Sequence, residues 1–292
     1  MIAMHYEKVA CMLNPQLTLN MGGKLLSLHR PIVMGILNTT PDSFYAGSRV
    51  LSEKELLESA AVMLEEGAVI LDVGGVSTRP GAAVVSEEEE RRRVLPVIAA
   101  IKRHFPEALI SVDTFRASIA AAAVAEGAVM VNDISAGRLD EAMYRTVAEL
   151  GVPYVLMHMQ GRPQDMQRNP VYGDVVLEVL DFLIAEVGKL RELGVKDIVI
   201  DPGFGFGKTI AHNFQLLRSL HVLGILELPV LAGISRKSTI YKTLGVTVQE
   251  ALNGTTALHM VALQQGAKIL RVHDVKPAQE VIRLWEALYN AE

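Results

Sequence analysis

The chain has a single cysteine, Cys11, among its 292 residues. A lone cysteine cannot form a disulfide within the chain, so we expect a protein of a reducing compartment and place it in the cytoplasm. Half of the residues are hydrophobic, and a chain of this length buries roughly 75% of the surface that it exposes when unfolded. The core therefore needs no disulfide or structural metal to stabilise it.

Long apolar runs and segregated charge are also lacking. No segment reaches the roughly 18 uninterrupted apolar residues that cross a bilayer, and the nearest candidate, 117–131, is interrupted by Glu126 and Gly127. The first thirty residues lack the basic start and long apolar core of a secretory signal. The net charge is −5, with acidic and basic residues interspersed. We therefore expect no membrane insertion, and no nucleic-acid binding through a basic stripe.

The common nucleotide and zinc motifs are missing as well. The segment DPGFGFGKT at 201–209 has Pro202 where a P-loop requires glycine, and its G-x-G-x-G spacing is not the dinucleotide fingerprint. The histidines outside the polar clusters described below show no zinc-ligand spacing. A P-loop, a dinucleotide site and a zinc site are therefore not expected.

What the chain does contain is a repeated alternation of short apolar runs and stretches with helical spacing. The runs predict strands at 31–37, 69–72, 109–113, 129–132, 153–157, 198–201, 229–232 and 268–272. The stretches predict helices at 53–66, 87–103, 116–126, 139–150, 175–193, 214–220, 250–265 and 277–288. Apolar strands separated by helices are typical of parallel strands covered on their outer face. Eight such units predict an α/β protein with a single (β/α)8 TIM barrel.

A β-hairpin is expected before the barrel. Residues 16–28 alternate apolar and polar side chains around a turn at 20–23, which is the pattern of two short antiparallel strands. We expect the hairpin to cover one end of the barrel. The chain, 1–292, is then one domain with a hairpin at 16–28 and a barrel at 31–290.

Nearly every predicted strand ends in polar or glycine-rich residues: Asn38, Asp72, Asp113, Asn132, His158, Asp201, Ser235 with Lys237, and Arg271 with His273. A parallel barrel gathers all its strand C-termini on one face, and barrel enzymes build their sites there. The sequence therefore predicts an active site on this face.

Three of these strand-end residues favour a particular ligand. Asp113, Asn132 and Asp201 combine carboxylates, which accept two N–H bonds side by side, with a carboxamide, which donates and accepts. Such a set suits a flat heterocycle that carries amide-like groups, with Phe206 available to line the pocket. For Asp133 and Asp42 we favour helix capping over ligand binding.

The last two strand ends carry cations and hydroxyl groups. Barrels often bind phosphate groups in this region, so Ser235, Lys237, Arg271 and His273 indicate an anionic substrate. A Schiff base on Lys237, with Arg236 lowering its pKa, is an alternative that the chemistry leaves open.

Two polar loops and one charged segment complete the pattern. NTTPDSF at 38–44 and DVGGVSTRPG at 72–81 suit loops that approach a ligand, the second with Arg79 over the site. Their alternatives are an ordinary turn and a solvated surface loop. EEEERRR at 87–93 pairs charges four residues apart, which indicates a solvated helix face.

Taken in order, NTTPDSF, DVGGVSTRPGA, SVDT, VND, LMHMQG, DPGFGFGK, GISRKS and RVHDV resemble the dihydropteroate synthase family. The resemblance extends from the hairpin near residue 16 to the last predicted helix, and it implies the same barrel. It also implies a transferase of folate biosynthesis that joins 6-hydroxymethyl-7,8-dihydropterin pyrophosphate to p-aminobenzoate with Mg²⁺ assistance. A homodimer and inhibition by sulfonamides, which mimic p-aminobenzoate, are further implications.

The resemblance also implies roles for individual residues. The pterin would be bound by Asp113, Asn132, Met157, Asp201, Phe206 and Lys237. The pyrophosphate would be held by Asn38, Arg271 and His273, with Asn38 also reaching Mg²⁺. The p-aminobenzoate site and the mobile loops would include Pro41, Phe44, Thr78, Arg79 and Ser238.

Two alternative functions remain at this point. A pterin-dependent methyltransferase can share the barrel and the acidic pterin contacts but does not need a pyrophosphate pocket. A pterin-binding relative without turnover is the other alternative. The cations at the last two strand ends argue against the methyltransferase.

Overall fold

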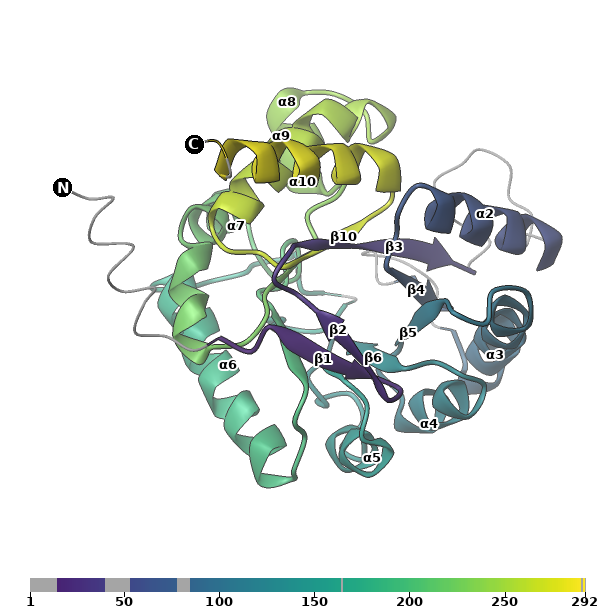
Figure 1. Ribbon diagram of the computed structural model, residues 1–292. Helices are drawn as coiled ribbons and strands as arrows, with labels where there is room; N and C mark the ends of the chain where they lie inside the picture. Colours follow the sequence, from purple (N-terminus) through teal and green to yellow (C-terminus); the bar gives the residue numbers. More distant parts are fainter. Residues whose placement is uncertain (1–14, 40–52, 78–84, 164, 290, 292) are drawn as a thin grey trace.

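The computed structural model describes residues 15–39, 53–77, 85–163, 165–289 and 291. Within these residues, parallel strands form a central barrel surrounded by helices (Figure 1). The strands are β3 (Ile32–Asn38), β4 (Ile70–Gly74), β5 (Leu109–Asp113), β6 (Met130–Asp133), β7 (Tyr154–Met157), β8 (Ile198–Asp201), β9 (Leu231–Ala232) and β10 (Ile269–Val272). Each falls on a predicted strand, and the TIM barrel is confirmed.

The barrel closes between its first and last strands. The strand order is β8-β7-β6-β5-β4-β3-β10-β9, and a parallel bridge between Ile200 and Val230 joins β8 to the residue before β9. The Ile200 amide donates to the Pro229 carbonyl at 2.9 Å. No edge is therefore left open between these two strands.

The helices that cover the barrel largely match the predicted ones. They are α2 (Glu53–Glu65), α3 (Glu87–His104), α4 (Ala117–Ala125), α5 (Met143–Leu150), α6 (Val175–Glu192), α7 (Ile210–Arg218), α8 (Ser238–Leu244), α9 (Leu252–Gln264) and α10 (Val275–Tyr289), with short 3-10 turns at Leu220–Leu226 and Gln249–Ala251. No helix among the described residues has the length and apolar character needed to cross a membrane.

Three helices differ from the prediction. Helix α5 begins at Met143 rather than at 139. Helix α7 begins at Ile210 rather than at 214, because the Thr209 hydroxyl caps its first turn by accepting from the His212 amide at 3.1 Å. Helix α8 was not predicted, since its seven residues, STIYKTL, are too few to show a helical period. This missed helix begins directly after Lys237.

The hairpin closes the N-terminal end of the barrel, as predicted. Strands β1 (Thr18–Met21) and β2 (Lys24–Ser27) pair around a two-residue turn, and Figure 1 shows them lying across this end. Their side chains Leu19 and Met21 are buried with residues from inside the barrel. The hairpin therefore completes the core at the end away from the predicted site.

The barrel interior has two layers of different chemistry. Alternate side chains of a strand point to opposite sides, and one inward set forms an apolar lower layer: Met34, Ile70, Met130, Val155, Val199, Leu231 and Ile269. Two residues further along the strands, the inward positions form an upper layer: Asp72, Ser111, Asn132, Met157, Asp201 and Arg271. The upper layer lies toward the strand C-termini, where the site was predicted.

Candidate active site

A cavity of about 460 Å³ lies at the C-terminal face of the barrel. Among the predicted site residues, its lining includes Asn38, Asp113, Phe206, Lys237, Ser238, Arg271 and His273. A larger hollow, of about 610 Å³, lies between α2 and the end of α3. We assign the site to the smaller cavity, because only it brings strand-end cations, a carboxylate and hydroxyls together.

Asn132, Met157 and Asp201 lie in the upper layer below this lining. They are 4%, 3% and 5% exposed, respectively. Met157 packs with Met166 and Phe206, both of which line the cavity. The predicted pterin residues are therefore close together. Asn132, Met157 and Asp201 form the buried floor of the cavity, whereas the others line it.

Arg271 connects the cavity to the upper layer. Its Nε donates to Asp72 Oδ2 at 2.6 Å, and its Nη2 donates to Asp113 Oδ2. Burial lowers the pKa of Arg271, but the Asp72 and Asp113 carboxylates outweigh burial and hold this pKa above its ordinary value. The guanidinium is therefore a fixed cation at the floor of the cavity.

Asp72 is a residue of this network that the sequence prediction did not include in the site. It is fully buried, and its Oδ2 also accepts from Asn132 Nδ2 at 2.9 Å. Strand β5 separates the strands of these two residues, so the bond crosses the barrel interior. The glycines after Asp72 suggested the beginning of a loop, whereas β4 continues to Gly74.

Asp113 faces charges of both signs. Its pKa is raised to about 7, mainly by burial, with Arg271 opposing the rise and Asp72 adding to it. A carboxyl group with this pKa changes its charge near neutral pH. The charge of Asp113 can therefore respond to a bound ligand.

Lys237 is a cation in the lining of the same cavity. Its Nζ donates to the Phe204 carbonyl and lies 4.7 Å from the centroid of the Phe206 ring. Burial lowers the pKa of Lys237 to about 8; Asp201 opposes this effect and Arg271 adds to it.

Arg236 does not have the effect on Lys237 that the sequence suggested. Its guanidinium makes two hydrogen bonds to the Asp274 carboxylate, at 2.7 and 2.8 Å. The low pKa of Lys237 was expected, but its assignment to Arg236 was wrong, because the pairing with Asp274 neutralises that charge.

Asp201 is held by the turn that follows its strand. Its Oδ1 accepts from the Gly203 amide at 2.7 Å, and burial raises its pKa against the opposing charge of Lys237. A Cβ atom on Gly233 would lie 3.7 Å from Asp201 Oδ2 and 3.8 Å from Lys237 Nζ. The missing side chain at Gly233 therefore leaves space beside both groups.

His273 is oriented by a neighbouring hydroxyl. Ser235 Oγ lies 3.1 Å from His273 Nδ1 and accepts from the His273 backbone amide at 3.2 Å. Both residues line the cavity. The imidazole therefore lines the same cavity as Arg271, and its role toward a phosphate stays a prediction.

Lys208 is a second residue that the prediction left out. It is 2% exposed, and its Nζ donates to the carbonyls of Gly203 and Phe206 at 3.0 Å each. His158 Nδ1 lies 2.9 Å from the same Nζ. No sequence pattern indicated this role, since lysine is rarely buried.

The pKa values around Lys208 explain how a buried lysine is tolerated. Burial lowers the pKa of Lys208 to about 7, and burial together with Lys208 lowers that of His158 to about 2. His158 is therefore a neutral acceptor. The lysine holds the turn after β8 in place, and this turn supplies Phe204, Gly205 and Phe206 to the cavity wall.

The same turn packs tightly against the end of β7. Gly203 has a φ of 69°, and a Cβ atom there would lie only 1.9 Å from the His158 carbonyl oxygen. Only glycine fits this contact and this backbone conformation. The glycines of DPGFGFGK thus bring the two strand ends together.

Asp133 is structural rather than ligand-binding, but the predicted helix capping is wrong. Its carboxylate accepts from the Ser135 and Gly137 amides at 2.7 and 2.8 Å and from the Tyr154 hydroxyl at 2.7 Å. These bonds hold the turn after β6. They do not cap a helix, because α5 begins only at Met143.

Part of the predicted site lies outside the described residues. Pro41, Phe44, Thr78 and Arg79 belong to this part, as does Asp42. Arg93 donates to the Gly75 carbonyl at 3.2 Å, and Arg116 donates to the Val85 carbonyl at 2.7 Å. These two arginines fix the described backbone on either side of 78–84.

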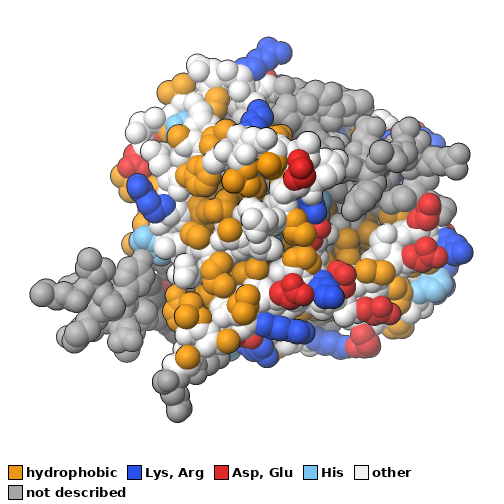
Figure 2. All heavy atoms as spheres, turned by 90° about the horizontal axis from the view of Figure 1, so that it is seen from above, with side chains coloured by type: hydrophobic (Ala, Val, Ile, Leu, Met, Phe, Trp, Pro, Cys, Tyr) orange, Lys and Arg blue, Asp and Glu red, His pale blue; other side chains and the backbone are white. Residues whose placement is uncertain are grey.

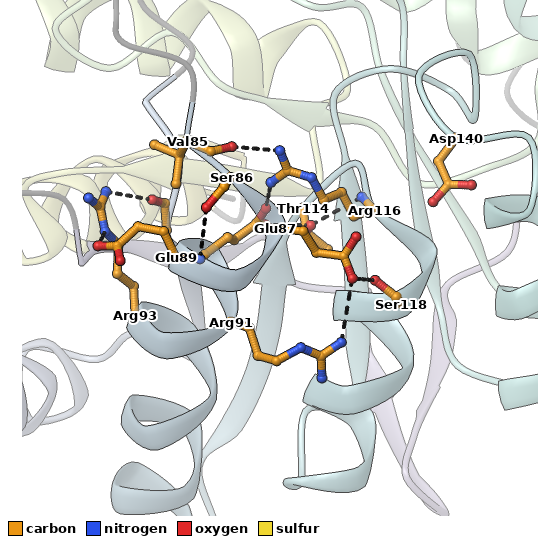
Figure 3. A network of polar contacts seen from close by, with 12 residues as sticks. Val85, Ser86, Glu87, Glu89, Arg91, Arg93, Thr114, Arg116, Ser118 and Asp140 are labelled. Carbon is orange, nitrogen blue, oxygen red and sulfur yellow. Dashed lines mark hydrogen bonds and ion pairs between the residues drawn. The ribbon is translucent and has the colours of Figure 1, made fainter.

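Figure 3 shows the polar network to which Arg93 and Arg116 belong. The predicted solvated face is present where Glu87 pairs with Arg91, whose side chains are 52% and 42% exposed. The prediction was wrong for Glu90, which is fully buried, pairs with Arg116 and accepts from the Thr114 hydroxyl at 2.6 Å. A partner on a neighbouring element, invisible to local charge spacing, makes this burial possible.

No cluster of three or more His, Cys, Asp or Glu side chains that could hold a metal occurs in the described part of the chain. A cation bound mainly by a substrate does not need such a cluster. Mg²⁺ usually keeps several waters and uses few protein oxygens beside substrate phosphates. Asn38, at the end of β3 and in the cavity lining, offers an oxygen of this kind.

Comparisons with known proteins agree with this geometry. Residues 34–273 match the family described as pterin binding enzyme. The dihydropteroate synthase of Escherichia coli K12 is 45% identical over 276 residues, which cover 92% of this chain and 96% of the relative.

Solved structures give the same result. A Yersinia pestis dihydropteroate synthase with a sulfonamide drug complex has a TM-score of 0.90 at 42% identity, covering 94% of this chain and 100% of that one. A Xanthomonas albilineans dihydropteroate synthase with 4-aminobenzoic acid has a TM-score of 0.88 at 43% identity, covering 94% and 99%. The fold and the site therefore define a pterin-binding barrel enzyme. Within that class, the chain belongs to the dihydropteroate synthase family.

Proposed function

We propose that this chain condenses 6-hydroxymethyl-7,8-dihydropterin pyrophosphate with p-aminobenzoate, which gives 7,8-dihydropteroate and pyrophosphate in folate biosynthesis. The observation that carries the proposal is that one cavity joins Lys237 and Phe206, which suit a flat ring, to Arg271 and His273, which suit an anion. Membership of the dihydropteroate synthase family supports the same reaction.

The pterin is bound by the upper layer and by the turn after β8. Asp201 accepts the amino group and the ring N–H side by side, and Lys237 donates to the pterin carbonyl. Asn132 contributes its carboxamide, while Met157 and Phe206 pack against the ring. The space beside Gly233 lies between Asp201 and Lys237, where these contacts require it.

The pyrophosphate is bound by Arg271, His273 and Asn38. Arg271 keeps N–H groups beyond those that contact Asp72 and Asp113, because a guanidinium has five of them. The Asn38 side-chain oxygen and the substrate phosphates together provide the sparse ligand set that Mg²⁺ accepts. When bound, Mg²⁺ would stabilise negative charge on the leaving group.

The p-aminobenzoate is bound near Ser238, which lines the cavity directly after Lys237. We include Pro41, Phe44, Thr78 and Arg79 in this part of the site on the strength of the family resemblance. The relative from Xanthomonas albilineans with 4-aminobenzoic acid supports a site for this ligand class in the same fold.

The reaction follows from the distribution of charge. The bond between the pterin methylene carbon and the pyrophosphate oxygen breaks early, and its electron pair leaves with the pyrophosphate. Arg271 and His273 stabilise that leaving charge. The Asp113 carboxylate stabilises the cation left on the pterin, and the amine nitrogen then attacks it and loses a proton. The feature that favours this order is a partly buried carboxylate, Asp113, in the same cavity as Arg271 and His273.

Pyrophosphate release tests the proposal. Purified chain with Mg²⁺ and the pterin pyrophosphate should release pyrophosphate only when p-aminobenzoate is added. Release without dependence on the amine would contradict the synthase. Methyl transfer from methyltetrahydrofolate to a cobalamin protein would instead identify a methyltransferase, and pterin binding without either reaction would identify a non-catalytic relative.

We also propose that the chain works in the cytoplasm as a homodimer. The single cysteine suits a reducing compartment. Apolar side chains gather on the face that carries α8 and α10 (Figure 2), where Leu244, Leu284, Leu288 and Tyr289 are more than half exposed. Exposed apolar patches of this kind are common at subunit contacts, and the molar mass in solution would test this assembly.

A further inference from the structure

Asp72 lies between the proposed pterin and pyrophosphate sites without lining the cavity itself. A single oxygen, Oδ2, accepts from Arg271 Nε at 2.6 Å and from Asn132 Nδ2 at 2.9 Å. The other oxygen, Oδ1, makes no hydrogen bond within the described residues although it is fully buried. Asp72 Oδ2 therefore contacts both Asn132, which we assign to the pterin, and Arg271, which we assign to the pyrophosphate.

The contact with Arg271 sets how strongly the site attracts an anion. Arg271 also contacts Asp113, so two carboxylates share one guanidinium. Asp201 and Lys237 also act on Arg271, and Glu90 and Asp133 act more weakly on Asp113. Removing the charge of Asp72 would make the floor of the cavity one unit more positive.

The contact with Asn132 sets the direction of a carboxamide. A carboxylate only accepts hydrogen bonds, so the side of Asn132 that faces Asp72 must be its NH₂ group. The carbonyl oxygen of Asn132 is thereby left for other donors. An amide in place of Asp72 could donate as well as accept, and the orientation of Asn132 would no longer be fixed.

We infer that Asp72 is a positioning residue that couples the two halves of the site: it orients Asn132 for the pterin and moderates the charge that Arg271 presents to pyrophosphate. This inference rests on the proposed function. Its consequence is that Asp72 favours pterin binding and weakens pyrophosphate binding, which helps the product anion to leave.

The opposite signs of these two effects give the test. In Asp72→Asn, inorganic pyrophosphate with Mg²⁺ should bind about threefold to tenfold tighter, because one nearby negative charge is gone. The affinity for 6-hydroxymethyl-7,8-dihydropterin, which lacks phosphate, should fall about tenfold, because the carboxamide loses its charged partner. Isothermal titration of each ligand measures both changes.

Asp133→Asn is the matched control. Asp133 is equally buried and follows Asn132 on β6, but its hydrogen-bond partners Ser135, Gly137 and Tyr154 do not line the cavity. Its charge has only a weak effect on Asp113. Its substitution should lower Tm while both affinities change by less than about twofold. A purely structural role for Asp72 would instead weaken both ligands in Asp72→Asn, and that result would overturn the inference.

The wild-type chain separates failure of the inference from failure of the proposed function. If it binds neither ligand, the proposed function fails. If it binds both and Asp72→Asn shifts both in the same direction, only the coupling fails. Should Asp72→Asn not fold, Asn132→Ser tests the link from its other end: pterin affinity should fall about tenfold while pyrophosphate changes less than about twofold. A larger change for pyrophosphate than for pterin would contradict the coupling.

Discussion

The lower and upper layers of the barrel interior are built from the same strands but have opposite chemistry. Ile70, Val199 and Ile269 fill the lower layer, and two residues later the same strands carry Asp72, Asp201 and Arg271. Burying apolar side chains stabilises the fold. Burying paired charges contributes little net stability, because desolvation offsets the attraction.

This comparison separates stability from function along a single strand. The hairpin side chains Leu19 and Met21 add to the lower layer and close it. The upper layer lies beneath a cavity that its cation Arg271 lines. Substitutions in the lower layer should therefore change stability, and substitutions in the upper layer should change binding and rate.

The largest effect is expected when the upper layer loses its central cation. Arg271→Ala should lower kcat/KM by about 10² to 10³, the usual cost of losing one charge stabiliser. The pterin without phosphate should still bind. Steady-state pyrophosphate release and pterin titration measure the two quantities, and a greater loss of pterin binding than of turnover would place Arg271 on the wrong half of the substrate.

A lower-layer substitution should have the opposite outcome. Leu19→Ala should lower the free energy of unfolding by about 2 to 5 kcal/mol, because Leu19 is fully buried. The kcat of the folded enzyme should change less than about twofold. Urea unfolding and activity at low denaturant check both parts.

The same hairpin provides a matched control. Leu25 is 77% exposed, so Leu25→Ala should change stability by no more than about 0.5 kcal/mol. Equal losses in the two variants would mean that the hairpin does not contribute through its buried face. A large loss of kcat in Leu19→Ala would mean that the layers are not independent.

The sequence predicted those features of the two layers that depend on neighbouring residues. It did not predict the features that depend on residues far apart in the chain. Strand order, hairpin and site face followed from local apolar runs and from the polar residues at their ends. Asp72 was named only as a strand-end residue, and the burial of Lys208 and Glu90 was missed, because partners more than twenty residues away determine these roles. Local pattern cannot show a bond that crosses the barrel.

A smaller effect should follow from filling the space beside the upper layer. Gly233→Ala adds a methyl group within van der Waals reach of Asp201 Oδ2 and Lys237 Nζ. Stability should be nearly unchanged, whereas pterin affinity should fall by about 1 to 3 kcal/mol, the effect of one methyl group in a tight pocket. Titration with the pterin measures the affinity, and a thermal melt measures the stability. An unchanged affinity would show that the pterin does not bind beside Gly233.

The smallest effect concerns pH. The pKa of Lys237 is lowered to about 8, so its cation is present below this pH and is lost above it. Pterin affinity should therefore fall by about 1 kcal/mol as pH rises from 7.5 to 9.5, because a neutral amine is the weaker donor. Titrations across this range should show the decline in the wild type and not in Lys237→Met. Any titration of the ligand itself affects both proteins equally and cancels in this comparison. An equal decline in the wild type and in Lys237→Met would contradict the role of Lys237.

Competition between the two substrate halves tests the central claim, that one site at the C-terminal face binds both. The measurement is the displacement of labelled 6-hydroxymethyl-7,8-dihydropterin pyrophosphate, without p-aminobenzoate, by the free pterin and by inorganic pyrophosphate with Mg²⁺. We predict one bound molecule per chain and full displacement by either competitor alone. Displacement by only one of them would contradict a common site.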